Sequence, residues 1–198
     1  MKKRITTGFL GLAIFLGAML AFFPAGTSQA ATDFSKVRVK LTNGTPSSQT
    51  ITVNGSYTIA QSPGTKVVAG SNTISNAGGT LSITTGGKKY SIGSTITLVN
   101  ADFNGQKNTI KATGHRGTNS YLGNMEFVAN GSKINAYSIV NMEHYIHGVL
   151  LHEMDNGWSV EALKAQAVAS RSFVCEHMSR GVSLTDTTTH QVYGGYNP

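Results

Sequence analysis

Cysteine and acidic residues are scarce in this sequence of 198 residues. The one cysteine, Cys175, has no partner, which excludes a disulfide-stapled scaffold. Nine Asp and Glu residues stand against 16 Lys and Arg, giving a net charge of +7. The charged share of 13% is low and the apolar share of 39% is high for a disordered chain. With 23 glycines, the composition also excludes a coiled coil or a helical repeat.

The first 30 residues carry part of the positive charge. Three basic residues within the first four positions precede an apolar stretch, Gly8–Phe23, and small residues follow up to Ala30. This order is typical of a secretory signal peptide. We therefore expect a secreted or cell-wall protein, outside the cytoplasmic membrane, whose mature chain carries 13 basic and nine acidic residues. The alternative is an uncleaved N-terminal anchor, although the stretch is shorter than the roughly 20 residues of a spanning helix. Membrane contact is expected only in that case.

Polar and apolar residues alternate over most of residues 36–141, which predicts short antiparallel strands. Asn54-Gly55, Gly86-Gly87 and Asn130-Gly131 each lie between two alternating runs, a pattern that predicts a β-hairpin at each. Very few charged residues interrupt this region before Gly87. We expect a meander of strands.

The period changes at Asn141. Apolar residues at positions 142, 145, 146, 149 and 150 fall on one face of a helix, predicted over 142–154. A second helix is predicted from Ser159, a candidate N-cap, to about Met178. Trp158 precedes it, and we expect it to pack at the joint between the helices; the alternative is that it lines a sugar groove. The fold class is α+β, an antiparallel β-rich part followed by two helices that carry the active-site segment.

Glu153 lies on the apolar face of the first predicted helix, eleven residues after Met142. Burial of a carboxylic acid favours its protonated form, which a general acid needs near neutral pH. Glu153 is therefore a candidate general acid. The alternative is that it lies in the last turn, where its side chain reaches water.

Other chemistries find less support. Cys175, His177 and His190 could offer three zinc ligands, but a second cysteine is missing and Cys175 falls in mid-helix. We expect no metal and no cofactor. Lys88-Lys89 is an isolated basic pair, so we expect no nucleic-acid partner.

Three motifs near the end of the chain resemble one known family. They are Glu153-Met154, the run Glu-Ala-Leu-Lys-Ala-Gln-Ala-Val-Ala over 161–169 followed by Arg171, and Gln191-Val192-Tyr193 with Gly195. Together with His115-Arg116-Gly117, they resemble the stage II sporulation protein D (SpoIID/LytB) family over about residues 113–196. The resemblance divides the chain into a signal peptide or anchor at 1–30, a β-rich region at 31–112 and a SpoIID-like core segment at 113–198.

The resemblance implies a cell-wall protein whose partner is the glycan strand of peptidoglycan. Some members are lytic transglycosylases that cleave strands stripped of stem peptides, and others enhance a cell-wall amidase. It implies that Glu153 is the catalytic acid, which protonates the glycosidic oxygen while the 6-hydroxyl of the sugar attacks. The alternative function is a non-catalytic wall-binding or amidase-enhancing protein, whose partner would be the amidase.

The same resemblance suggests glycan-positioning roles for Gln166, Arg171, Gln191 and Tyr193. For Gln166 and Arg171 the alternative is hydrogen bonding between helix and sheet. The sequence departs from the family in three ways. His152 replaces the usual Ser, the places of zinc ligands in some members hold Thr residues and His190, and the family's domain continues past Gly195, so we expect an incomplete core segment.

Overall fold

The computed structural model describes residues 33–155 and 157–197. The segment interpreted as a signal peptide, residues 1–30, lies outside the described residues. The described residues belong to one compact unit, and residue 112 lies within strand β9 (Thr109–Gly114). Within the described residues, no helix is both long and apolar enough to cross a membrane.

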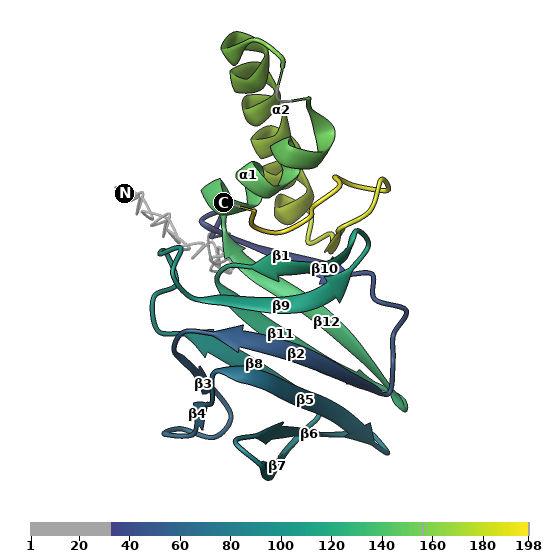
Figure 1. The fold of residues 1–198 in the computed structure, drawn as a ribbon. Coiled ribbons are helices and arrows are strands. Elements are labelled where there is room, and N and C mark those ends of the chain that lie inside the picture. The colour runs from purple at the N-terminus through teal and green to yellow at the C-terminus, as the bar shows by residue number, and fades with distance from the viewer. Residues whose placement is uncertain (1–32, 156, 198) are drawn as a thin grey trace, which may run out of the picture. The chain divides into compact units, whose positions relative to one another are not determined.

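Two antiparallel sheets make up the β-rich part, followed by two helices, so the predicted α+β fold is confirmed (Figure 1). The first sheet has the order β13 (Leu184–Thr185), β1 (Lys36–Leu41), β12 (Lys133–Asn141), β11 (Asn124–Asn130), β8 (Thr95–Asn100), β3 (Tyr57–Ile59), β4 (Lys66–Val67). The second has the order β10 (Gly117–Tyr121), β9 (Thr109–Gly114), β2 (Ser48–Asn54), β5 (Gly70–Ala77), β6 (Thr80–Thr85), β7 (Lys88–Gly93). Only the short pairing of β13 with β1 is parallel.

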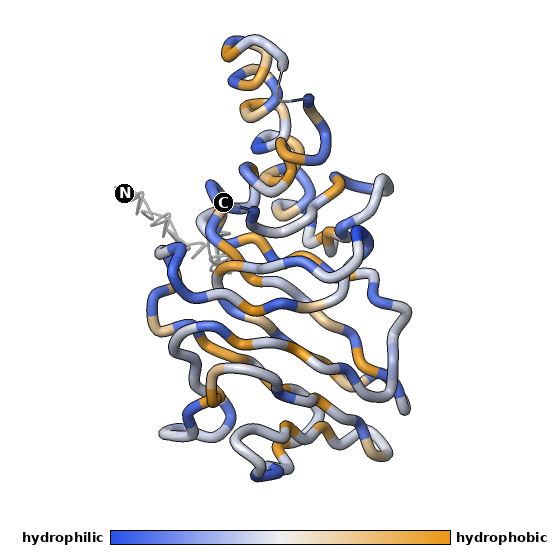
Figure 2. Tube along the Cα trace, viewed as in Figure 1, coloured by the Kyte–Doolittle hydropathy of each residue, from blue (hydrophilic) through white to orange (hydrophobic). Residues whose placement is uncertain are grey.

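The predicted alternation places one face of each strand in the core. In β12 every second side chain from Ile134 to Val140 is buried, and β8 and β9 follow the same rule. Figure 2 shows hydrophobic and hydrophilic residues interspersed along the strands. A single hydrophobic cluster includes side chains of both sheets, such as Val39 from β1 and Ile51 from β2. The sheets therefore enclose one core between their apolar faces.

Two of the three predicted hairpins are confirmed and one is wrong. β6 pairs with β7 around Gly86-Gly87, and β11 pairs with β12 around Asn130-Gly131. The strands that flank Asn54-Gly55 do not pair, because β2 joins the six-stranded sheet while β3 joins the seven-stranded sheet. Gly55 has a φ of 94°, and a Cβ there would overlap the side chain of Asn108. The turn therefore passes the chain from one sheet to the other.

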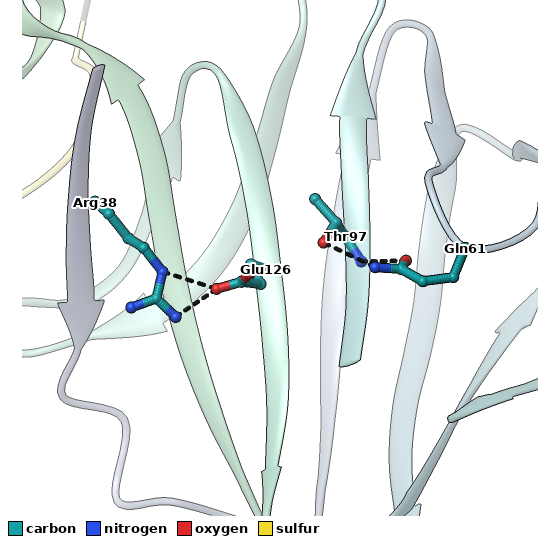
Figure 3. Close-up of polar contacts among 4 residues, drawn as sticks. All are labelled: Arg38, Gln61, Thr97 and Glu126. Atoms are coloured by element: carbon teal, nitrogen blue, oxygen red, sulfur yellow. Dashed lines mark hydrogen bonds and ion pairs between the residues drawn. The ribbon is translucent and has the colours of Figure 1, made fainter. Parts of the chain in front are cut away.

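Polar side chains connect strands of the seven-stranded sheet. Arg38 of β1 donates from Nε to Glu126 of β11 at 2.8 Å (Figure 3). Its guanidinium lies over the ring of Tyr137, on the intervening β12, at 3.4 Å. Gln61 binds both the backbone N–H of Thr97 (2.9 Å) and its hydroxyl (3.1 Å). The first contact joins β1 to β11, and the second joins β8 to the loop that follows β3. Both are made by polar side chains outside the hydrophobic core.

Both helices form where the sequence predicts them. Helix α1 (Met142–Glu153) begins at Asn141, whose side chain accepts the N–H of Glu143 at 2.8 Å. Helix α2 (Val160–Ser179) begins at Ser159, whose hydroxyl accepts the N–H of Ala162. The buried face of α1 packs on the strands, whereas α2 buries only Ser170 and Val174. In Figure 1 the two helices lie together at one end of the sheets.

Candidate functional site

Glu153 is the last residue of α1, and its side chain is exposed rather than buried on the apolar face. Of the two interpretations of the sequence, burial on the apolar face or a place in the last turn with access to water, the structure shows the second. The carboxylate is nevertheless held in place. Its Oε1 accepts the backbone N–H of Val192 at 2.7 Å. One end of the carboxylate is thus fixed by the backbone while the side chain stays open to solvent.

The segment that contacts Glu153 is itself anchored behind it. The hydroxyl of Tyr145, on α1, donates to Oε1 of Gln191 at 3.2 Å. The ring of Tyr193 packs against those of Tyr145 and Tyr121, with centroids 5.0 and 5.9 Å apart. Burial raises the pKa of Tyr193 to about 12. The structure thus brings Gln191 and Tyr193 beside Glu153, but their buried side chains face the protein and position this segment rather than reach the surface.

His152 approaches the same segment at Gly194. Its ring occupies the space that a Cβ on Gly194 would need, so this glycine permits the close approach. Burial lowers the pKa of His152, and the positive charge of Arg116 lowers it further. Arg116 belongs to the turn between β9 and β10, far from His152 in the sequence. The site therefore combines an anchored carboxylate with a neutral imidazole and a nearby guanidinium.

Comparison with known proteins decides the family. A family model described as "Stage II sporulation protein" (SpoIID) matches residues 130–198. A segment of 52 residues is 48% identical to the "Amidase enhancer" of Bacillus subtilis, and one of 80 residues is 38% identical to an uncharacterized protein of Brachyspira hyodysenteriae. The C-terminal part of this chain belongs to the SpoIID family.

The two relatives are much longer than the parts that match. The matches cover 26% and 38% of this chain, but only 7% of the amidase enhancer and 22% of the Brachyspira protein. No solved structure matches the chain. The family assignment therefore applies to residues 130–198, which include β12, the two helices and the tail.

The other two residues predicted to position glycan, Gln166 and Arg171, lie on α2. Arg171 forms an ion pair with Glu143 at 2.6 Å, and Glu143 lies ten residues before Glu153, about 15 Å along the axis of α1. Gln166 donates to the hydroxyl of Ser170 in its own helix at 3.4 Å. The structure therefore brings neither side chain to Glu153, and Arg171 instead connects the two helices.

A buried carboxylate that sequence reasoning missed connects the tail to the turn of Arg116. Asp186 has no exposed surface, and its two oxygens accept the N–H groups of Thr42 (2.9 Å) and His115 (2.7 Å). Its own N–H donates to the carbonyl of Lys40 at 3.1 Å. Asp186 thus fixes the loop after β1 and the β9–β10 turn to the tail that contacts Glu153. It lies in a Thr-rich stretch without periodicity, so no local signal pointed to it.

The residues weighed as metal ligands have other contacts. The rings of His177 and His190 lie 5.4 Å apart, and Nδ1 of His190 lies 2.9 Å from the Thr185 hydroxyl. Among residues 33–155 and 157–197, no three His, Cys, Asp or Glu side chains gather as a metal site would require.

Trp158 does not pack at the helix joint as expected. It is 56% exposed, and the neighbouring Leu151 and Val160 are 42% and 64% exposed. Three exposed apolar side chains therefore lie within nine residues of Glu153 in the sequence.

Proposed function

We propose that this SpoIID-family protein is exported, binds the glycan strands of peptidoglycan and cleaves them as a lytic transglycosylase with Glu153 as the general acid. The observation that carries the proposal is the Glu153 carboxylate, which is fixed by the Val192 N–H at 2.7 Å and open to solvent. A polymeric substrate needs a reacting group at the surface, and a fixed carboxylate needs no reorientation before proton transfer.

The chemistry proceeds with a single carboxyl group. Protonated Glu153 gives its proton to the glycosidic oxygen as the bond from that oxygen to the anomeric carbon breaks. The 6-hydroxyl of the same sugar attacks the anomeric carbon and its proton passes to the Glu153 carboxylate, which restores the acid. The products are a new chain end and a 1,6-anhydro sugar, and no water is consumed.

The surroundings of Glu153 then depend on the substrate. Because the carboxylate is exposed in the free protein, we infer that a bound glycan covers it and lowers the local polarity. A second carboxylate is not required, and Asp155 is engaged in the turn, where it accepts the N–H of Gly157 at 2.7 Å.

Mass spectrometry of peptide-free glycan strands incubated with the mature protein tests this proposal. We expect 1,6-anhydro-muramyl ends with the wild type and at least a hundredfold fewer with Glu153→Gln. A well-folded wild type that produces no such ends would refute the enzymatic function.

The exposed side chains of Leu151, Trp158 and Val160 support a second candidate. Large apolar side chains at the surface are available to bind another protein, and one relative is named an amidase enhancer. If the chain acts by binding a cell-wall amidase, we expect Trp158→Ser to reduce the stimulation of that amidase, while Glu153→Gln leaves it unchanged. The enzymatic proposal instead predicts that Glu153→Gln abolishes the formation of anhydro ends, while Trp158→Ser affects it less.

A further inference from the structure

The outer face of the six-stranded sheet is rich in hydroxyl groups and free of carboxylates. None of its six strands contains Asp or Glu, and outward positions of neighbouring strands carry Thr or Ser. Pairing places Thr52 of β2 opposite Lys111 of β9, and Lys111 opposite Ser120 of β10. Three strands therefore present polar side chains in one row.

This row forms the floor of a groove of about 640 Å³. Gln106 and Lys107, from the loop before β9, line it together with Tyr196 of the tail. The Tyr196 hydroxyl donates to Oε1 of Gln106 at 3.2 Å, so loop and tail are joined at its edge. Glu153 does not line this groove, whose lining comes from the second sheet, the residue before β5, the 106–107 loop and the end of the tail.

The groove lies in the positive part of the protein. Residues 33–141 carry ten Lys and Arg against three Asp and Glu, a net charge of +7, whereas residues 142–197 carry three against six. Lys107 and Lys111 form no ion pair with any described carboxylate, and no described acidic residue lines the groove. The positive charge here is therefore uncompensated and available to a ligand.

We propose that this groove binds a glycan strand that carries carboxylate groups, as a second site apart from Glu153. Hydroxyl and amide side chains match the donors and acceptors of sugars. Only two lysines accompany six neutral polar or aromatic side chains in the lining. That ratio fits a sugar chain with widely spaced negative charges better than a polymer with a phosphate on every unit. The choice of a cell-wall strand, with its muramyl carboxylates, rests on the proposed function.

The tail links the two sites. Val192 contacts Glu153, and Tyr196, four residues later, lines the groove. Four residues span at most about 14 Å. A strand held in the groove is thereby kept near the carboxylate, so the groove serves to retain the polymer.

Isothermal titration calorimetry of the mature protein tests the groove. The probe is soluble peptide-free glycan strands, and the variant is Lys107→Gln with Lys111→Gln. The matched control is Lys88→Gln with Lys89→Gln, which removes the same charge from β7 on the far edge of the same sheet. We expect the groove variant to bind about tenfold more weakly and the control to change by less than about twofold.

Other results of these titrations would contradict the proposal or part of it. Equal weakening in both double variants would show a general charge effect and overturn the proposal, as would no weakening in either. Equally tight binding of neutral N-acetylglucosamine oligomers would exclude the lysines as determinants, and equally tight binding of polyglycerol phosphate would overturn the choice of a carboxylated glycan. A loss of anhydro ends in Glu153→Gln with unchanged titration separates this site from the catalytic proposal.

Discussion

Gly148 is the point where helix α1 meets the segment that holds Glu153. A Cβ on Gly148 would lie 2.6 and 2.9 Å from two ring carbons of Tyr193 and would overlap the carbonyl oxygen of Gly195. The Gly194 N–H also donates to the Gly148 carbonyl at 3.4 Å. The Gly195 carbonyl cannot move easily because it is backbone, and the Tyr193 ring cannot because it is buried between Tyr121 and Tyr145.

Two effects of opposite sign compete in Gly148→Ala. Alanine in a helix interior stabilises by about 1 kcal/mol relative to glycine. Overpacking in a closely packed interior costs about 1–3 kcal/mol. Because the overlap involves rigid groups, we take the upper part of that range and expect a net loss of about 1–2 kcal/mol in the free energy of unfolding.

Thermal unfolding, monitored by circular dichroism, measures the net effect of helix propensity and overpacking on stability. The expected loss lowers Tm by about 2–8 °C for a chain of this size. Ala165→Gly, on the exposed face of α2, measures the difference in helix propensity between alanine and glycine without a packing change, and should lower Tm by about 2–4 °C. A rise in Tm for Gly148→Ala would show that propensity dominates and would refute the close contact between α1 and the tail.

Three further results are expected. Asp186→Ala leaves two backbone N–H groups without their acceptor and should lower the free energy of unfolding in urea by about 2–4 kcal/mol, whereas a loss below about 0.5 kcal/mol would show that Asp186 does not hold the tail. Arg171→Ala should cost less than about 1 kcal/mol and leave glycan cleavage unchanged, because its ion pair with Glu143 is partly exposed; a large loss of glycan cleavage at full stability would show that Arg171 takes part in the reaction. Burial lowers the pKa of His152, so the unfolded state takes up a proton that the folded state resists, and stability should fall as pH drops from about 6.5 to 5. His152→Gln should reduce that fall in urea titrations at the two pH values, and an unchanged fall would contradict the assignment.

The sequence predicts local structure well and strand partners less well. The Gly86-Gly87 and Asn130-Gly131 hairpins follow from turn residues between alternating runs. The same reasoning fails at Asn54-Gly55, because a turn signal specifies a change of direction but not which strand pairs next. There the apolar faces of β2 and β3 are buried in different sheets.

The site shows a similar division. Helical periodicity and the family resemblance both lead to Glu153, and periodicity leaves two interpretations open, of which the structure shows the exposed one in the last turn of α1. The contact with Val192 and the approach of Arg116 arise from chain segments 39 and 36 residues away from their partners in the sequence. Such contacts depend on tertiary packing, which no local pattern encodes.

The number of 1,6-anhydro-muramyl ends released from peptide-free strands tests the role of Glu153 most directly. The comparison is between Glu153→Gln and Asp155→Asn, which each remove one negative charge at nearly the same place; Asp155→Asn keeps the oxygen that accepts the Gly157 N–H. We expect Asp155→Asn to release about as many ends as the wild type and Glu153→Gln to release almost none. Equal release by the two variants would contradict the assignment of Glu153 as the general acid.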